Sequence, residues 1–308
     1  MTLAEALHHA QERLRSAGIP GAELEAELLL RHALGLSREA LYARLQQALD
    51  PAAARSFEAM LARRLAHEPS AYITGHTEFY GLALACTPAA LIPRPETELL
   101  VELALDWVKG QGSLAWVKGQ GSRVKAGEEA RDKGQGRAPA RLVVDVGTGN
   151  GAIAVAIAVH APRARIVGID TSRAALALAR RNAGAQGVAG RVLLAQGSLL
   201  APVRGEVDVI VANLPYVPTR LYRALPPELR EHEPEGALHA GRRGTALIER
   251  LLAEAPALLR PGGLLLAEHA WNQGRRLRET ARVAFPRARI ETQRDLAGRE
   301  RALVVENV

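Results

Sequence analysis

Cysteine is almost absent from this sequence, since Cys86 is the only one among 308 residues. A single cysteine excludes an intramolecular disulfide and a cysteine-ligated zinc site, and it is typical of a reducing compartment. The simplest interpretation of Cys86 is a small buried apolar residue. Aromatic residues are also scarce, at 4% of the chain. The core must therefore be built from aliphatic side chains.

Long apolar runs and metal-binding motifs are missing too. No run of about 18 apolar residues occurs, and Glu5 interrupts the N-terminus where a signal peptide would be apolar. The nine histidines are dispersed, and no zinc-protease, hydrolase or P-loop motif is present. The net charge of +7 comes from scattered residues and only weakly favours polyanions. We expect a cytoplasmic protein, with no membrane segment and no metal.

The first 70 residues have the spacing of amphipathic helices. Apolar residues recur at intervals of three and four from Leu3 to about Ala66. The pair Asp50-Pro51 has the order of a helix cap followed by a first-turn proline. No catalytic motif occurs here. We expect residues 1–70 to form a bundle of four or five helices that docks a substrate or, alternatively, only stabilises the chain.

A connector and an insertion follow this bundle. Residues 71–92 contain β-forming residues punctuated by glycines and predict a hairpin-like connector. Two prolines then stiffen a loop before a helix that is expected to begin near Glu96. The segment Trp107-Val-Lys-Gly-Gln-Gly-Ser113 recurs unchanged at residues 116–122. Residues 107–138 are accordingly predicted to be a flexible insertion.

Residues 93–308 have the pattern of an α/β domain. Short apolar runs alternate with helical stretches along most of this part. The expected strands are residues 142–146, 165–170, 192–196, 207–212, 263–268, 288–292 and 302–306. This alternation predicts a doubly wound fold with a mostly parallel sheet, which binds ligands at the carboxyl ends of its strands.

A glycine-rich loop follows the first expected strand and leads into an apolar helix. Glycines let the backbone approach a ligand, and the helix N-terminus presents free N–H groups. The loop residues expected to bind a cofactor are Asp145, Gly147, Thr148, Gly149, Asn150 and Gly151. Asp170 ends the second strand about twenty residues further on, where a carboxylate can bind both ribose hydroxyls.

The identity of the cofactor depends on the residues around these glycines. The loop by itself also fits a dinucleotide fingerprint, so it does not separate NAD from S-adenosylmethionine. Asp145 would repel a pyrophosphate but suits the ammonium of a methionine moiety. The end of the fourth strand also favours S-adenosylmethionine, because it has the residues of a methyl-acceptor site.

That acceptor site is the run Asn213-Leu214-Pro215-Tyr216. An amide or exocyclic amino nitrogen is a poor nucleophile with two N–H donors in one plane. The Asn213 side-chain oxygen and the Leu214 backbone carbonyl can each accept one of them, Pro215 stiffens the backbone, and Tyr216 offers a face for stacking. We assign substrate binding to all four residues and catalysis to Asn213, Pro215 and Tyr216, with Asn213 also contacting the cofactor.

The chain resembles the release-factor glutamine methyltransferases, also called the PrmC or HemK family. The resemblance extends over nearly the whole chain. It rests on Ala26-Glu-Leu-Leu-Leu30, Tyr72-Ile-Thr-Gly75, Glu78-Phe-Tyr-Gly81, Ile92-Pro-Arg-Pro-Glu-Thr-Glu98, the glycine loop, Asn213-Leu-Pro-Tyr216, Leu225-Pro-Pro-Glu228, Glu233-Pro234 and Asp295-Leu-Ala-Gly-Arg299.

The resemblance implies a class I Rossmann-like methyltransferase domain after the helical bundle. It also implies S-adenosylmethionine as cofactor and, as substrate, the glutamine of the Gly-Gly-Gln motif in class 1 peptide chain release factors. Ser198 and Leu199 follow the third strand where the family generally has an acid near adenine, and Leu214 replaces a proline. We expect a monomer without stable nucleic-acid binding.

Three alternatives remain open from the sequence. An enzyme that methylates an amino group of adenine or guanine in DNA or RNA would use the same Asn-x-Pro-Tyr geometry on a flipped base. A sister family methylates a glutamine in a ribosomal protein, although it usually differs from this chain in the Arg-Pro-Glu-Thr-Glu run. A ribosome-associated binding protein could also retain such a cofactor pocket without activity.

Overall fold

The computed structural model describes residues 1–110 and 140–308. Most of the insertion predicted at 107–138 lies outside these described residues. The predicted start of the insertion at residue 107 was wrong. Trp107 and Val108 instead form the end of a helix and pack against the hydrophobic core.

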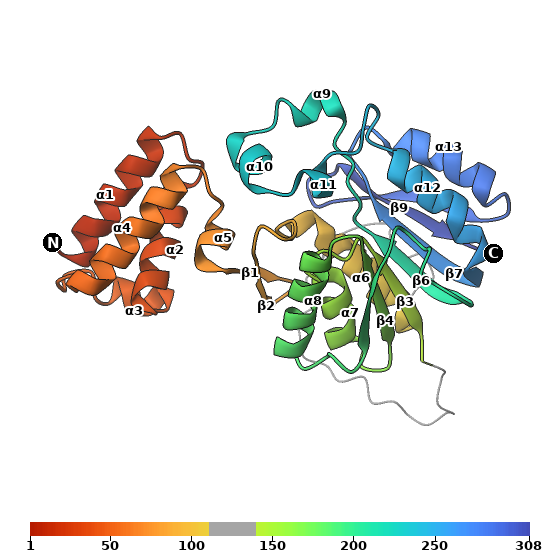
Figure 1. The fold of residues 1–308 in the computed structure, drawn as a ribbon, viewed down its shortest axis with the longest axis horizontal. Helices are drawn as coiled ribbons and strands as arrows, with labels where there is room; N and C mark the ends of the chain where they lie inside the picture. Colours follow the sequence, from red (N-terminus) through yellow and green to blue (C-terminus); the bar gives the residue numbers. More distant parts are fainter. Residues whose placement is uncertain (111–139) are drawn as a thin grey trace.

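Five helices form the N-terminal part of the molecule (Figure 1). They are α1 (Leu3–Ser16), α2 (Ala22–Leu34), α3 (Arg38–Tyr42), α4 (Pro51–Leu65) and α5 (Ser70–Thr74). Thr2 and Glu5 form a reciprocal capping box at the start of α1. Asp50 caps α4 by accepting two backbone N–H groups. Aliphatic side chains fill the core between these helices, as the helical spacing of the sequence predicts.

A two-stranded hairpin connects this bundle to the larger domain. Its strands are β1 (His76–Phe79) and β2 (Leu82–Ala85), which pair antiparallel. Tyr80 and Gly81 form the turn with φ angles of 51° and 72°, as a two-residue hairpin turn requires. The Asn182 side chain binds both backbone groups of Ala85 and fastens the hairpin to the larger domain.

The larger domain is built on a seven-stranded sheet with the order β5-β4-β3-β6-β7-β9-β8. The strands are β3 (Leu142–Val146), β4 (Arg165–Asp170), β5 (Val192–Gln196), β6 (Val207–Ala212), β7 (Leu259–Glu268), β8 (Arg289–Arg294) and β9 (Glu300–Glu306). Strands β3 to β7 run parallel, and β9 is antiparallel to both of its neighbours. The predicted α/β class with a mostly parallel sheet is confirmed.

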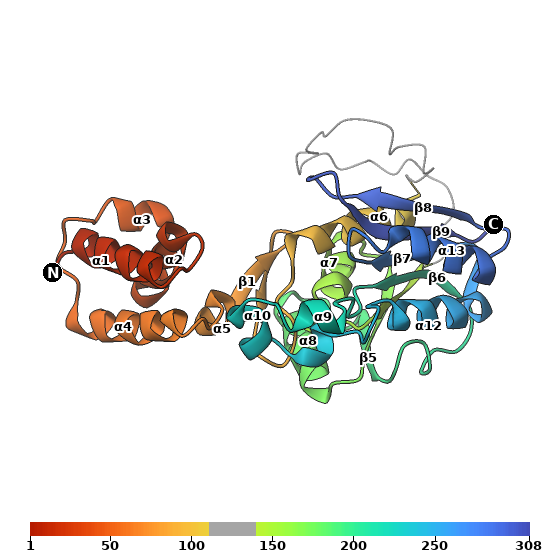
Figure 2. The ribbon, with the colours of Figure 1, turned by 90° about the horizontal axis from the view of Figure 1, so that it is seen from above.

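Helices cover both faces of this sheet (Figure 2). One face packs against α6 (Glu98–Val108), α7 (Ala152–His160) and α8 (Arg173–Ala185). The other packs against α12 (Ala246–Glu254) and α13 (Gly274–Ala284). Alternate strand residues face opposite layers, so Val143 lies in the first core and Val144 in the second. Two short 3-10 helices, η1 (Pro95–Thr97) and η3 (Ala255–Ala257), precede α6 and β7.

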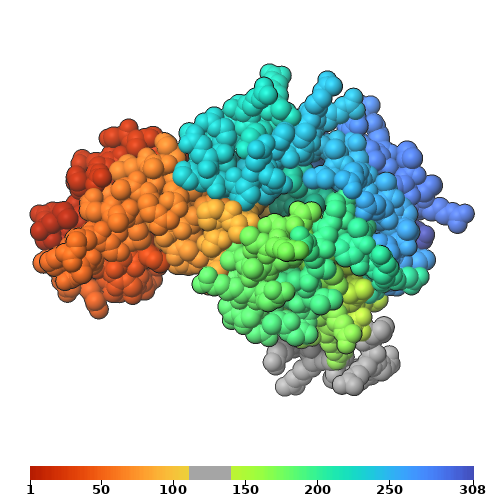
Figure 3. Space-filling model, in the orientation of Figure 1, coloured from red at the N-terminus to blue at the C-terminus, as the bar shows by residue number. Residues whose placement is uncertain are grey.

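The segment between β6 and α12 contains three further short helices. They are α9 (Thr219–Tyr222), α10 (Pro227–His232) and α11 (Glu235–Leu238). This segment lies beside the N-terminal bundle (Figures 1 and 3). Arg64 of α4, which is 2% exposed, joins the two parts by binding Glu25 of the bundle and Glu228 of α10. No helix within the described ranges is long and apolar enough to cross a membrane.

Candidate functional site

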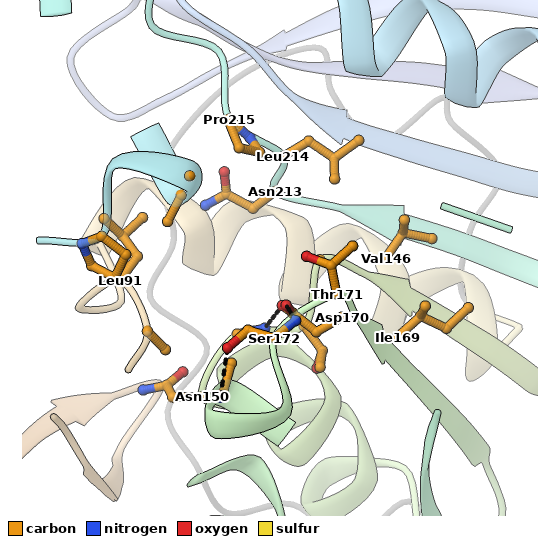
Figure 4. Close-up of a pocket in the computed structure, with 18 of the residues that line it drawn as sticks. Leu91, Val146, Asn150, Ile169, Asp170, Thr171, Ser172, Asn213, Leu214 and Pro215 are labelled. Atoms are coloured by element: carbon orange, nitrogen blue, oxygen red, sulfur yellow. Dashed lines mark hydrogen bonds between the residues drawn. The ribbon is translucent and has the colours of Figure 1, made fainter. Parts of the chain in front are cut away.

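A cavity of about 290 Å³ opens at the carboxyl ends of β3, β4 and β6. The strand order reverses at this point, which is where open α/β sheets bind ligands. Figure 4 shows Asn213 and Pro215 facing Asp170 across the cavity. The strand ends and loops that line it are residues 147–150, 169–172, 197–199 and 213–215, with Leu91, Pro93, Pro234, Gly236 and Ala237 on the remaining side.

The structure brings most of the predicted site residues to this one cavity. Those that line it are Gly147, Thr148, Gly149, Asn150, Asp170, Ser198, Leu199, Asn213, Leu214 and Pro215. Three others, Asp145, Gly151 and Tyr216, are not part of its wall. Asp145 binds the wall residue Thr148, and Tyr216 binds Glu268, which in turn binds the wall residue Thr97.

Glycines in the loop meet two different steric demands. Gly147 has a φ of +74°, and a β-carbon there would lie 3.0 Å from the Leu214 side chain. Gly151 has a φ of +83°, and its β-carbon would lie 3.0 Å from that of Ala179 in α8. Gly147 therefore lets the loop approach the acceptor run, whereas Gly151 lets α7 pack closely against α8.

The Asp170 carboxylate is held in place by the backbone of two loops. Its Oδ2 accepts the N–H of Gly149 at 2.9 Å, and its Oδ1 accepts the N–H of Ser172 at 2.8 Å (Figure 4). A carboxylate has about four acceptor positions, so each oxygen can still accept from a ligand. Asp170 thus fixes the glycine loop and offers a preorganised acceptor pair to the cavity.

Asp145 lies beneath the glycine loop and has no exposed surface. Its Oδ2 accepts the Thr148 hydroxyl at 2.6 Å and the N–H of Ala154 at 3.2 Å. Its Oδ1 has no hydrogen-bond partner among the described residues. Burial raises the pKa of this carboxyl to about 7, because removal from water disfavours the charged form. Direct contact with a ligand's ammonium, as expected from the sequence, does not fit this buried position.

A chain of hydrogen bonds orients the acceptor asparagine. Thr97 Oγ1 lies 2.7 Å from Glu268 Oε2 and 2.9 Å from Asn213 Nδ2. Because a carboxylate only accepts, the threonine hydroxyl donates to Glu268 and accepts from the asparagine amide. Asn213 must therefore turn its NH₂ group toward Thr97. Its Oδ1 remains available as a hydrogen-bond acceptor.

Tyr216 completes this chain from the other side of Glu268. Its hydroxyl donates to Glu268 Oε1 at 3.1 Å. Burial raises the pKa of the Glu268 carboxyl, while the bonds from Thr97 and Tyr216 oppose that rise. The sequence predicted that Tyr216 would stack on the substrate. In the structure its hydroxyl binds Glu268, and the residue is not among those that line the cavity.

Comparisons with known proteins agree with this architecture. The model of the PrmC N-terminal domain matches residues 5–75, and that of the Methyltransferase small domain matches residues 134–222. A release factor glutamine methyltransferase from Moorella thermoacetica is 40% identical over 99% of this chain and 98% of its own length. Another, from Deinococcus radiodurans, is 39% identical over 98% of this chain and 97% of its own.

The chain belongs to the release factor glutamine methyltransferase family. It therefore contains a methyltransferase domain. Among solved structures, the human Mettl16 catalytic domain in complex with a MAT2A 3'UTR hairpin has a TM-score of 0.54. It is 15% identical and aligns over 84% of this chain and 81% of its own, a likeness that shows the fold alone.

Two residues of this family member have site roles that the sequence did not reveal. Thr97 stands in the Arg-Pro-Glu-Thr-Glu run that supports the family resemblance, but it is 116 positions from Asn213. Glu268 merely ends an expected strand. The place of Glu268 along the chain could have indicated its role. It ends the strand beside the one that precedes Asn213, and neighbouring parallel strands end at the same edge of a sheet.

The buried carboxylate of Glu233 stabilises the side of the cavity for which the sequence predicted no site residues. Glu233 accepts the N–H of Ile92 at 3.0 Å, forms an ion pair with Arg94, and accepts the Tyr72 hydroxyl at 3.3 Å. Burial raises the pKa of Glu233, and the Arg94 guanidinium opposes that rise. The cavity-lining residues next to Ile92 and Glu233 are thereby held together.

Proposed function

We propose that this protein transfers a methyl group from S-adenosylmethionine to the side-chain amide nitrogen, N5, of the glutamine in the Gly-Gly-Gln motif of class 1 peptide chain release factors. The observation that supports this most directly is the orientation of Asn213. Its Oδ1 remains available as an acceptor in the same cavity as the glycine loop and Asp170. The names of the relatives in Moorella thermoacetica and Deinococcus radiodurans agree with this substrate.

The residues along the β3 and β4 ends fit S-adenosylmethionine. Asp170 would bind the ribose hydroxyls with the acceptor positions that Gly149 and Ser172 leave free. The loop backbone at residues 147–150 would hold the methionine part beside the N-terminus of α7. Ser198 and Leu199 would flank the adenine. When bound, S-adenosylmethionine supplies an electrophilic methyl group, which the glutamine nitrogen takes up with loss of one N–H proton to water.

Asn213 and Leu214 would prepare the glutamine nitrogen for this transfer. The Asn213 Oδ1 and the Leu214 backbone carbonyl each accept one amide N–H and so fix the plane of the amide. These dipoles favour the positive charge that develops on the nitrogen. Pro215 limits movement of the backbone that carries the second acceptor. A strong base is not required before transfer, because the proton becomes acidic only as the new bond forms.

One assay tests this proposal against nucleic-acid and ribosomal-protein substrates. Purified protein is incubated with methyl-labelled S-adenosylmethionine and, separately, with class 1 release factors, ribosomal proteins, RNA or DNA. We expect label only in release factor, and mass spectrometry should place it on the glutamine of Gly-Gly-Gln. Label on adenine or guanine, or on a ribosomal glutamine alone, would contradict the proposal.

A further inference from the structure

A second hollow lies at the same edge of the sheet as the acceptor site. It has a volume of about 430 Å³ and lies between the start of α13 and the turn that joins β8 to β9. The side chains that matter here are Trp271, Arg275, Arg278, Arg294, Arg299 and Glu300. They belong neither to the cofactor cavity nor to the acceptor chain.

The turn beside this hollow is closed by several hydrogen bonds and presents an apolar side chain to solvent. Asp295 accepts the Arg299 N–H and the Arg301 guanidinium through its two carboxylate oxygens, each at 2.9 Å. The backbone of Asp295 also binds those of Gly298 and Arg299 at 2.9 Å. Leu296, at the tip, is nevertheless fully exposed. The leucine side chain is therefore accessible to another molecule.

Arginines and one tryptophan line the hollow next to this turn. Trp271 is 63% exposed, and the guanidinium of Arg299 forms no ion pair or hydrogen bond with residues 1–110 and 140–308. Glu300 neutralises part of the charge, since it lies 3.2 Å from Arg278 and 3.8 Å from Arg294. The surface therefore combines exposed apolar groups with an excess of positive charge, and tryptophan and arginine are enriched at protein interfaces.

The turn is connected to the acceptor asparagine through a short series of contacts. Arg301, which binds Asp295, lies 3.8 Å from Glu96 through its guanidinium. Glu96 is the neighbour of Thr97, which binds Asn213. This surface and the acceptor site are therefore joined by a short series of residues.

We propose that Trp271, Leu296 and Arg299 dock an acidic and partly apolar segment of the protein that carries the acceptor glutamine, outside the Gly-Gly-Gln tripeptide. This inference rests on the proposed function. The positive charge selects for acidic side chains, and the exposed leucine and tryptophan select for apolar ones. A nucleic acid fits less well, because a single tryptophan offers one stacking platform only.

The test compares a whole release factor with a short synthetic peptide centred on Gly-Gly-Gln. The variant Leu296→Asp/Arg299→Glu should raise KM for the release factor at least about tenfold, the change expected from losing one strong interface contact. Methylation of the peptide and affinity for S-adenosylmethionine should stay within twofold. Trp271→Ala is an independent second variant with the same expected pattern.

A matched control changes an exposed aliphatic residue and an exposed arginine at and beyond the C-terminal end of α13. Val283 is 83% exposed, Arg287 is exposed as well, and both follow the start of α13 that borders the hollow. Val283→Asp/Arg287→Glu should leave both KM values unchanged. Equal loss on release factor and peptide, or no loss on either, would overturn the docking surface.

Two further results separate this inference from the proposed function. A wild-type protein that methylates no release factor refutes the proposed function itself. An active wild type whose Leu296→Asp/Arg299→Glu variant has an unchanged KM refutes only the docking surface. Loss of binding to labelled single-stranded RNA in that variant, with release factor methylation unaltered, would assign the surface to nucleic acid instead.

Discussion

The side-chain amide of Asn213 donates a hydrogen bond to Thr97 Oγ1 over 2.9 Å, although 116 positions separate the two residues. Thr97 is 3% exposed and donates in turn to Glu268. This order of donors determines which end of the Asn213 amide is free. An asparagine without such a partner could turn over and present N–H groups to a substrate that needs acceptors.

Replacing Thr97 by valine should therefore reduce turnover, because it removes the hydroxyl that binds Asn213 and Glu268. Valine has nearly the same shape but cannot hold the Asn213 amide, so we expect kcat to fall about tenfold or more. Binding of S-adenosylmethionine should change little. Thr97→Ser restores the hydroxyl and should recover most of kcat. If serine and valine variants were equally impaired in kcat, Thr97 would be a packing residue only.

Asn213→Ala tests the acceptor role directly. The substitution removes the side-chain oxygen and leaves the glycine loop intact, so kcat on release factor should fall on the order of a hundredfold or more. Cofactor affinity, measured by calorimetry, should change much less.

Asn213→Asp provides a finer comparison at the same position. It keeps an acceptor but adds negative charge near the sulfonium, which should favour the charged ground state over a transition state in which that charge disperses. The aspartate variant should bind S-adenosylmethionine and still turn over slowly. A near wild-type rate in the alanine variant would exclude Asn213 from catalysis.

Local sequence patterns predicted the framework of this site well. All seven strands of the main sheet were expected, and β3 to β6 have the expected bounds. The reason is physical, because strands buried on both faces appear as short apolar runs between glycines and helices. The glycine loop and Asn213 follow two of these strands directly, so their positions at one sheet edge could be inferred from the topology.

Contacts between distant segments could not be predicted in this way. Nothing in the local pattern around Thr97, Glu233 or Glu268 shows that each would be buried among polar partners. The same limitation applies to Asp145 and Tyr216, which were expected to contact cofactor and substrate and do not line the cavity. Which polar side chain faces a cavity depends on how the helices and loops pack, and this cannot be predicted from hydrophobic periodicity.

Asp170→Ala should weaken cofactor binding for two reasons. It removes the acceptors proposed for the ribose, and it also frees the backbone N–H groups of Gly149 and Ser172. We expect a loss of about 1.5 to 3 kcal/mol, which is roughly ten- to a hundredfold in affinity. Asp170→Asn keeps one acceptor and should lose less. Calorimetry that shows unchanged affinity in the alanine variant would disprove the ribose assignment.

Asp145 provides a prediction about the pH dependence of stability. Its pKa is raised to about 7 in the folded protein from the usual 3.8, because the carboxyl is fully buried. Between these two values the folded state binds the proton that the unfolded state has lost. The contribution of this group to the free energy of unfolding therefore falls as pH rises from about 4 to about 7, and is constant above that.

The matched variant Asp145→Asn removes the ionisable group and keeps an oxygen that can accept from Thr148 and Ala154. Urea unfolding of both proteins at pH 5 and pH 8 isolates the effect, because the other titrating groups are shared. From pH 5 to pH 8, the free energy of unfolding of the wild type should fall by up to ~3 kcal/mol more than that of the variant. Its unfolding midpoint should fall accordingly relative to that of the variant. Parallel pH dependence in the two proteins would mean that Asp145 stays ionised in the folded state throughout this range, so the buried carboxylate would have to be stabilised by more than its bonds to Thr148 and Ala154.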